Sequence, residues 1–185
     1  MSEQRRSPWV VDTRELGRRP GLSRDVHRVV HTQDALGVPG VIAVPKAAEV
    51  ELDVLLESVV EGVLVSGTAL APIEGECSRC LDPISGAEIE VEFTELFAYP
   101  DSTTEQTTDE DEISRLVDDL VDLEPVVRDA AVLALPSVPL CTPDCAGLCA
   151  DCGGKWADLG PDHRHETIDP RWAALTERFS TDRDE

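Results

Sequence analysis

Residues 50–69, which read VELDVLLESVVEGVLVSGTA, decide the fold of this chain. Apolar side chains stand at every second position in the first part of this stretch. Side chains that alternate in this way point to opposite faces of a β-strand. Glu61-Gly62 interrupts the pattern as a turn would, and a second apolar run follows it. We therefore predict a β-hairpin over residues 47–76.

The sequence on either side predicts further short strands. One is expected at residues 8–12 and another at 38–44, where apolar residues lie between turn-forming glycines and prolines. A longer strand is expected after a Cys-x-x-Cys turn, because Ile89, Val91 and Phe93 alternate with acidic side chains. That strand should bury one face and expose the other to water.

Two helices are expected in the second half of the chain. An apolar stripe at helical spacing predicts a helix over residues 123–135, with Asp122 as a cap and Pro136 after its end. Asp169-Pro170 is typical of a helix start and predicts a final helix with Trp172 on its apolar face.

These elements predict an α+β protein with a mostly antiparallel β-sheet or partly open barrel, one or two helices and a zinc-stapled C-terminal loop. We divide the chain into a basic N-terminal strand and arm at 1–31, an α+β core at 32–140, and a Cys/His-rich zinc segment with the C-terminal helix at 141–179. Within the core, residues 100–112 hold six acidic residues and no base, and we expect a disordered loop there.

The charge of the chain is strongly negative and unevenly distributed. The net charge is −22, yet residues 1–31 carry seven arginines against four acids, which gives +3 and leaves −25 for residues 32–185. An acidic body repels nucleic acid and attracts basic proteins. We expect a basic partner for the body, and contact with RNA only through the N-terminal arginines.

The N-terminal residues lack the apolar segment of a signal peptide, and no apolar run approaches the ~20 residues of a membrane span. We therefore expect a soluble cytoplasmic protein without a membrane partner. In a reducing compartment disulfides rarely persist. The six cysteines of the chain then indicate metal or redox chemistry.

Cysteine and histidine side chains recur at spacings typical of zinc ligands. An x2 spacing lets two thiolates reach one ion from a tight turn, and thiolates favour zinc or iron–sulfur over magnesium or calcium. Zinc is preferred here, since nothing in the sequence supplies an electron-transfer partner. Eight candidate ligands, enough for two tetrahedral sites, are Cys77, Cys80, Cys141, Cys145, Cys149, Cys152, His163 and His165.

Three partitions of these ligands are possible. The favoured one joins the pair at 149 and 152 to the two histidines as a local module, and leaves the other four cysteines for a site that closes a long loop. Alternatively, the pair at 77 and 80 joins the pair at 149 and 152 in a zinc ribbon. In the third partition the four cysteines from 141 to 152 form one local site.

The sequence lacks the common catalytic motifs. Gly153-Gly154-Lys155 is no phosphate-binding loop, because Trp156 stands where Ser or Thr is required. No GxGxxG, GxSxG or HExxH motif occurs. A catalytic zinc keeps an open position, whereas four-ligand sites rich in thiolate are closed and structural. We therefore predict a protein with no catalytic residues that is not an enzyme.

The order of several short segments resembles the YceD family, the large ribosomal RNA subunit accumulation proteins, over roughly residues 8–178. The segments that carry the resemblance are Gly75-Glu76-Cys77-Ser78-Arg79-Cys80-Leu81-Asp82-Pro83, Asp122-Leu123-Glu124-Pro125, Leu133-Ala134-Leu135-Pro136, Leu140-Cys141, Asp144-Cys145-Ala146-Gly147-Leu148-Cys149 with Cys152-Gly153, and Asp169-Pro170-Arg171-Trp172-Ala173-Ala174-Leu175. Many members of that family have Cys-x-Cys where this chain has His163-Arg164-His165, a replacement that retains zinc ligands.

The resemblance implies a role in the accumulation or processing of large-subunit ribosomal RNA. The expected partner is a large ribosomal subunit precursor or a basic ribosomal protein, with zinc as the cofactor. Two other hypotheses remain open at this point. A zinc-thiolate redox sensor would need an accessible cysteine of low pKa, and a direct RNA-binding protein would have to overcome the acidic charge.

Overall fold

The structure is a computed structural model that describes residues 7–100, 102–103, 113–165 and 171. Within these residues the chain forms nine strands and one regular α-helix, α2 (Glu124–Ala134). The strands are β1 (Val10–Asp12), β2 (Ser23–His31), β3 (Leu36–Val38), β4 (Ile42–Val44), β5 (Glu49–Ser58), β6 (Gly62–Glu76), β7 (Pro83–Ala98), β8 (Ser114–Arg115) and β9 (Leu120–Asp122).

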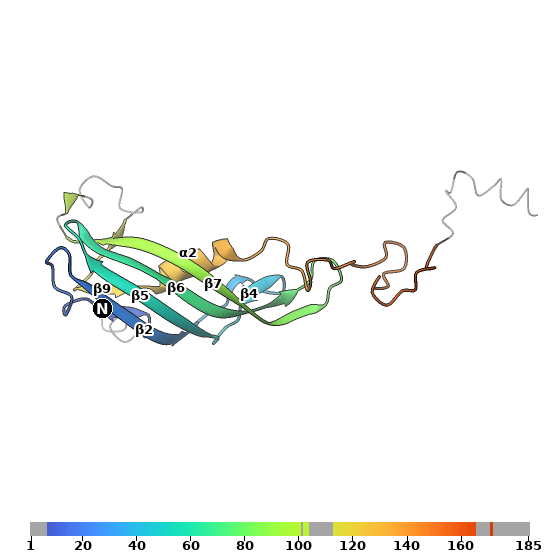
Figure 1. The fold of residues 1–185 in the computed structure, drawn as a ribbon, viewed down its shortest axis with the longest axis horizontal. Coiled ribbons are helices and arrows are strands. Elements are labelled where there is room, and N and C mark those ends of the chain that lie inside the picture. Colours follow the sequence, from blue (N-terminus) through green and yellow to red (C-terminus); the bar gives the residue numbers. More distant parts are fainter. Residues whose placement is uncertain (1–6, 101, 104–112, 166–170, 172–185) are drawn as a thin grey trace, which may run out of the picture.

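Seven of these strands form one large open sheet (Figure 1). Its path runs β2-β5-β6-β4-β3, while β7 pairs with the other side of β6 and carries β8 at one end. Strands β1 and β9 form a separate two-stranded sheet. Every pairing is antiparallel except that of β7 with β8. The prediction of an α+β fold with a mostly antiparallel, open sheet is confirmed.

The hairpin predicted from residues 47–76 is formed by β5 and β6. Its register pairs Ser58 with Val63 next to the turn and Glu51 with Leu70 far from it. Leu52, which alternation places on the apolar face, is fully buried. Burial of a leucine side chain stabilises a fold by about 1.5–3 kcal/mol, so this periodicity fixes which face of the sheet is covered.

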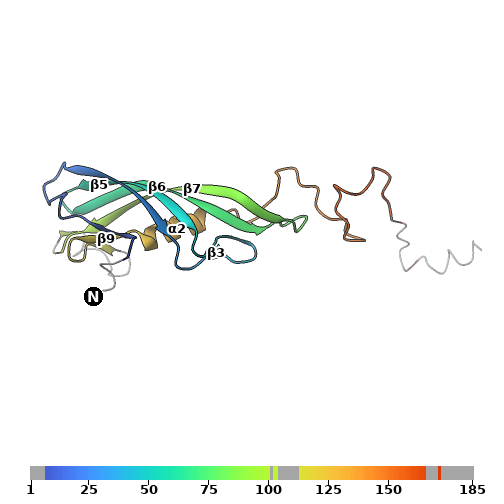
Figure 2. The ribbon, with the colours of Figure 1, turned by 90° about the horizontal axis from the view of Figure 1, so that it is seen from below.

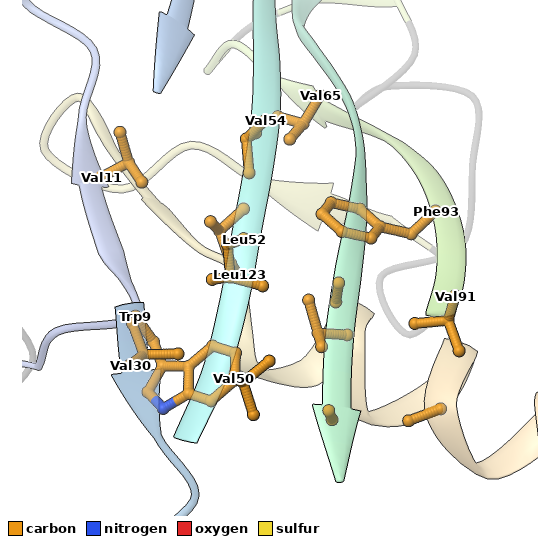
Figure 3. Packing of buried hydrophobic residues seen from close by; sticks show 14 of the residues in the cluster. Trp9, Val11, Val30, Val50, Leu52, Val54, Val65, Val91, Phe93 and Leu123 are labelled. Carbon is orange, nitrogen blue, oxygen red and sulfur yellow. The ribbon is translucent and has the colours of Figure 1, made fainter. Parts of the chain in front are cut away.

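The hydrophobic core lies between that covered face and the layer formed by β1, β9 and α2 (Figure 3). Trp9 and Leu123, which flank the two-stranded sheet, are at most 1% exposed. The indole Nε1 of Trp9 donates a hydrogen bond to the carbonyl of His31, 3.2 Å away. This bond satisfies the one polar atom of a large buried ring and ties the start of the chain to the end of β2.

The opposite face of the sheet points to solvent and is acidic. Cross-strand neighbours lie on the same face. One row across the sheet contains His27, Asp53, Thr68 and Glu92 in successive strands. Eight carboxylates on β2, β5 and β7 alternate with buried or half-buried positions, and the outward positions of these strands and of β6 hold no lysine or arginine. The eight are Asp25, Glu49, Glu51, Asp53, Glu57, Glu88, Glu90 and Glu92, and we call this surface the acidic face.

Residues 36–44 form a hairpin, whereas the sequence predicted a single strand at 38–44. The turn lies at Pro39-Gly40, where proline fixes φ and Gly40 adopts a φ of +82°. The amide of Val41 donates to the carbonyl of Val38 at 3.0 Å. This turn separates β3 from β4, and so the prediction of one strand was wrong.

Helix α2 begins and ends within a residue of the predicted range 123–135, and it lies against the sheet near β7 (Figure 2). Its buried residues are Val127 and Ala131. Leu123 occupies the N-cap position, but a side-chain oxygen of Asp122 still accepts a hydrogen bond from the amide of Glu124 at 3.1 Å.

Other predictions fall largely outside the described residues. They are the acidic loop expected at 100–112 and the final helix expected from Asp169-Pro170. Among the residues that the structure describes, no helix is both long and apolar enough to cross a membrane.

Candidate metal centres

The first candidate centre contains Cys77, Cys80, Cys141 and Cys145. The first two cysteines lie in the connection between β6 and β7, and the other two lie in the segment that follows α2. In Figures 1 and 2 that segment extends beyond the end of the sheet where β6 turns into β7. The four sulfur atoms lie within 4.8 Å of one another.

The spacing of these sulfurs suits a tetrahedral thiolate site. Cys77 Sγ and Cys145 Sγ are 3.7 Å apart, and Cys80 Sγ and Cys141 Sγ are 3.5 Å apart. Four sulfurs at about 2.3 Å from a zinc ion would be separated by about 3.8 Å. A disulfide would require about 2.05 Å. The arrangement therefore corresponds to four free thiols around one point, and a zinc ion fits it.

Backbone hydrogen bonds favour thiolate formation at one of these cysteines. The pKa of the Cys77 thiol is lowered to about 6. The backbone amide of Cys80 is the largest cause, and the amides of Cys141 and Arg79 act in the same direction, whereas burial raises the pKa. Burial is the first cause that raises the pKa of Cys145. Four thiolates so close together need a cation, because like charges at such distances disfavour ionisation. The donor set thus matches the chemistry of a soft divalent metal ion.

The second candidate centre contains Cys149, Cys152, His163 and His165. Its ligand atoms also lie within 4.8 Å of one another. Cys149 Sγ is 3.2 Å from His165 Nε2, and Cys152 Sγ is 3.6 Å from His163 Nε2. The two Nε2 atoms are 2.8 Å apart, closer than the about 3.3 Å expected around tetrahedral zinc. Both histidines thus present the same ring nitrogen to the two sulfurs.

The two Cys-x-x-Cys turns have the same backbone construction. In each turn, the amide four residues after the first cysteine donates a hydrogen bond to the carbonyl of that cysteine. Leu81 donates to Cys77 and Gly153 donates to Cys149, both at 2.9 Å. Leu81 has a φ of +60° and Gly153 a φ of +69°. In the second turn the amides of Cys152 and Asp151 are the first causes that lower the pKa of Cys149, to about 6. Each turn therefore prepares one sulfur as a thiolate.

Direct contacts join the two centres. Asp82 accepts hydrogen bonds from Cys80 Sγ at 3.3 Å and from the ammonium group of Lys155, which follows the second turn. The lysine is the first cause that lowers the pKa of Asp82. Within the first centre itself, Arg79 donates to the carbonyl of Cys145 at 2.9 Å and so holds the Cys77–Cys80 turn against the segment that follows α2. The second centre is thus docked on the first through the Cys77–Cys80 turn.

All eight residues singled out in the sequence lie in these two groups, and the grouping is the favoured one. The ribbon and the single local site are not formed, because Cys149 and Cys152 face the histidines. Binding of a metal ion by either group stays a prediction. The sequence analysis missed Asp82 and Lys155, since no motif relates two residues that are 73 positions apart.

Comparison with known proteins identifies the family. A sequence model of the family described as "Large ribosomal RNA subunit accumulation protein YceD" matches residues 65–177, which contain both candidate centres. The chain belongs to the YceD family. This confirms the resemblance found in the sequence, and it connects the chain with the accumulation of large-subunit ribosomal RNA.

Similar proteins occur in mycobacteria and in Bacillus. The chain is 51% identical to the uncharacterized protein Rv2926c of Mycobacterium tuberculosis, over 96% of this chain and 84% of that protein. It is 42% identical to the uncharacterized protein ML1660 of Mycobacterium leprae, over 95% of this chain and 80% of that protein. The uncharacterized protein YlbN of Bacillus subtilis is 27% identical over 64% of each chain. No solved structure matches the chain significantly.

Proposed function

We propose that this YceD-family protein is a non-enzymatic, zinc-binding factor of the cytoplasm that supports large ribosomal subunit biogenesis by binding a ribosomal component. The family match over residues 65–177 carries the biological role. The two groups of cysteine and histidine donors support zinc as the cofactor, and the acidic face supports a basic protein as the partner.

The chemistry of the donors supports zinc in both centres. Cys77, Cys80, Cys141 and Cys145 would hold one ion, and the group of two cysteines and two histidines would hold the other. Zinc in such closed sites supplies a cross-link between chain segments. Backbone amides lower the pKa of the Cys77 and Cys149 thiols, which favours the thiolate form that a zinc ion binds. With four protein donors in each group, neither site leaves a position for substrate, which supports a role without catalysis.

The acidic face supports a basic partner. Its eight carboxylates lie on one side of the sheet, and the outward positions of β2, β5, β6 and β7 hold no lysine or arginine. The negative electrostatic potential of such a surface attracts cationic proteins and accelerates their association. A basic ribosomal protein, free or within a subunit precursor, has the complementary charge.

The N-terminal arginines contribute less to RNA contact than their number suggests. Arg18 pairs with Asp119 at 2.9 Å and stacks over Tyr99, and Arg24 pairs with Glu15 at 3.1 Å. Arg28 donates to the carbonyls of Pro8 and Val10. These guanidinium groups hold the first strand and the following loop onto the sheet, which favours binding of a protein over direct binding of RNA.

Sedimentation of tagged protein from cell extracts tests the proposal. Full-length protein should migrate with large-subunit precursors or with a basic ribosomal protein, and moderate salt should weaken the association. Ribonuclease should leave the protein partner bound. Complete loss of the association after ribonuclease would favour direct RNA binding, and no co-migration under any condition would contradict the proposed role.

A redox-sensing function is a second candidate, because one ligand of each centre is exposed. Cys141 and Cys152 are exposed, whereas their partners Cys145 and Cys149 are buried. Exposed thiolate ligands can be oxidised. Zinc release at micromolar peroxide, together with an unchanged ribosomal association of the oxidised protein, would favour the sensor.

A further inference from the structure

The open side of strand β7 is a second feature of the sheet that suits a partner. β7 is 16 residues long, and β6 pairs with one side of it over most of its length. On its other side, the described part of the chain provides only the short strand β8, opposite Phe97 and Ala98. The backbone groups of an unpaired strand edge are ready to pair with another extended chain.

A groove lies along this edge, between β7 and helix α2. It has a volume of about 530 Å³ and is lined by β7 from Glu92 to Glu95, by Ser114 and by one side of α2. The helix contributes apolar side chains, including Val126 and Leu133, and the Leu133 side chain is 85% exposed. An extended peptide beside β7 could therefore bury apolar side chains against the helix while its backbone pairs with the strand.

Charge decides which peptide fits. Glu92, Glu95 and Asp129 line the groove, and none of its lining residues is a lysine or arginine. On the outward side of the same edge, Glu90 and Glu92 belong to the acidic face. An acidic or neutral peptide would leave these carboxylates without counter-charges, whereas a cationic one would complement them.

We propose that β7 and α2 form a docking groove for an extended segment in which cationic and apolar residues alternate. The inference rests on the proposed function in that it names the surface and the partner chemistry through which that function acts. Side chains of an added strand alternate between two sides. Those on the outward side meet Glu90 and Glu92, and those on the inward side meet Val126 and Leu133. A segment of about six residues spans roughly 20 Å of the edge.

Peptide binding to the full-length, zinc-loaded chain tests this proposal. The probe is a nine-residue synthetic peptide in which lysine and valine alternate, and the control peptide has the same composition with all lysines first. Fluorescence anisotropy should show that the alternating peptide binds about tenfold more tightly. Amide signals of β7 and α2 should shift in the NMR spectrum. Equal affinity for both peptides would overturn the proposal, because it would reveal attraction to the acidic charge alone.

Matched variants locate the contact. Glu92→Lys should weaken binding about tenfold, whereas the matched Glu51→Lys, on the acidic face over β5, should not. Leu133→Ser should weaken binding, whereas Val132→Ser, on the same helix but outside the groove, should not. Equal effects of Glu51→Lys and the groove variants would overturn the groove. Since sedimentation of the unmodified protein tests the ribosomal role separately, failure of the groove and failure of the role are distinguishable.

Discussion

The two candidate metal centres use the same type of turn but connect very different lengths of chain. The first centre joins Cys80 to Cys141 across 61 positions and Cys77 to Cys145 across 68. The second joins Cys149 to His165 across 16 positions and Cys152 to His163 across 11. The first therefore fastens the segment after α2 to the sheet, whereas the second shapes a local loop. Similar ligand chemistry can thus serve tertiary attachment in one place and local folding in another.

The first centre is also more deeply buried than the second. Three cysteines of the first centre are buried and form a small cluster with Leu140 and Leu148. In the second centre only Cys149 is buried. The main core of the sheet contains none of these cysteines. We therefore expect the sheet to keep its fold without metal, and the attached segment to depend on it.

Metal removal should have the largest effect. Exhaustive chelation should abolish the protection of backbone amides in residues 138–165, because the free energy of zinc binding, about 10–16 kcal/mol in structural sites, is the folding energy of such segments. Amides in β5 and β6 should remain protected. Hydrogen exchange followed by mass spectrometry measures both regions at once. Uniform loss of protection throughout the sheet would show that the two parts are not separable.

Loss of one ligand should cost more in the first centre than in the second. Closing a loop of 61 positions costs about 1 kcal/mol more chain entropy than closing one of 16, so the longer cross-link restricts the unfolded chain more. Cys80→Ser should therefore lower the melting temperature by about 3 °C more than His165→Ala. Differential scanning calorimetry of both variants with zinc in excess provides the comparison. The opposite order would contradict the assignment of roles.

Corresponding positions of the two turns should respond oppositely to substitution. Leu81 has a φ of +60°, a conformation that costs a non-glycine residue about 1 kcal/mol, and its side chain is 62% exposed. Leu81→Gly should thus leave stability unchanged or raise it slightly, whereas Gly153→Ala should lower it by about 1 kcal/mol. Denaturant titrations monitored in the zinc-bound state measure both changes. Equal losses of stability in the two variants would show that the similar φ angles of Leu81 and Gly153 do not determine how the turns respond.

The contact between the centres should have the smallest effect. Lys155→Ala removes the partially exposed ion pair with Asp82, and pairs of this kind contribute little. Amide exchange in the second centre should become faster, while exchange in the Cys77–Cys80 turn stays unchanged. Lys46→Ala, which removes an exposed pair with Asp34 elsewhere, is the control. A large destabilisation of the first centre by Lys155→Ala would show that the two are one folding unit.

The features that the sequence predicted are those with local periodicity or spacing. The β5–β6 hairpin follows from alternation in β5, the turn at Glu61-Gly62 and the apolar run after it, and α2 from an apolar stripe between a cap and a proline. The grouping of ligands was favoured because Cys149, Cys152 and the histidines are close along the chain. The structure adds that both groups bring their donor atoms together.

Strand β2 was missed because its pattern is not that of a buried strand. Its inward positions include Arg24 and Arg28, and only Val30 is fully buried. The guanidinium of Arg28 is held by the carbonyl oxygens of Pro8, just before β1, and of Val10, its first residue. Such tertiary hydrogen bonds make an arginine acceptable on the covered side of an edge strand. No local rule predicts them, and the same holds for the contact of Asp82 with Lys155.

The number of zinc ions per chain tests the central claim most directly. Native mass spectrometry of protein purified from the cytosol of the expression host should show two zinc ions in the wild-type chain. Cys141→Ser with Cys145→Ser should reduce the number to one, and so should His163→Ala with His165→Ala, since each pair belongs to a different centre. A wild-type chain without zinc, or with a single ion that both double variants remove, would contradict the account of two separate centres.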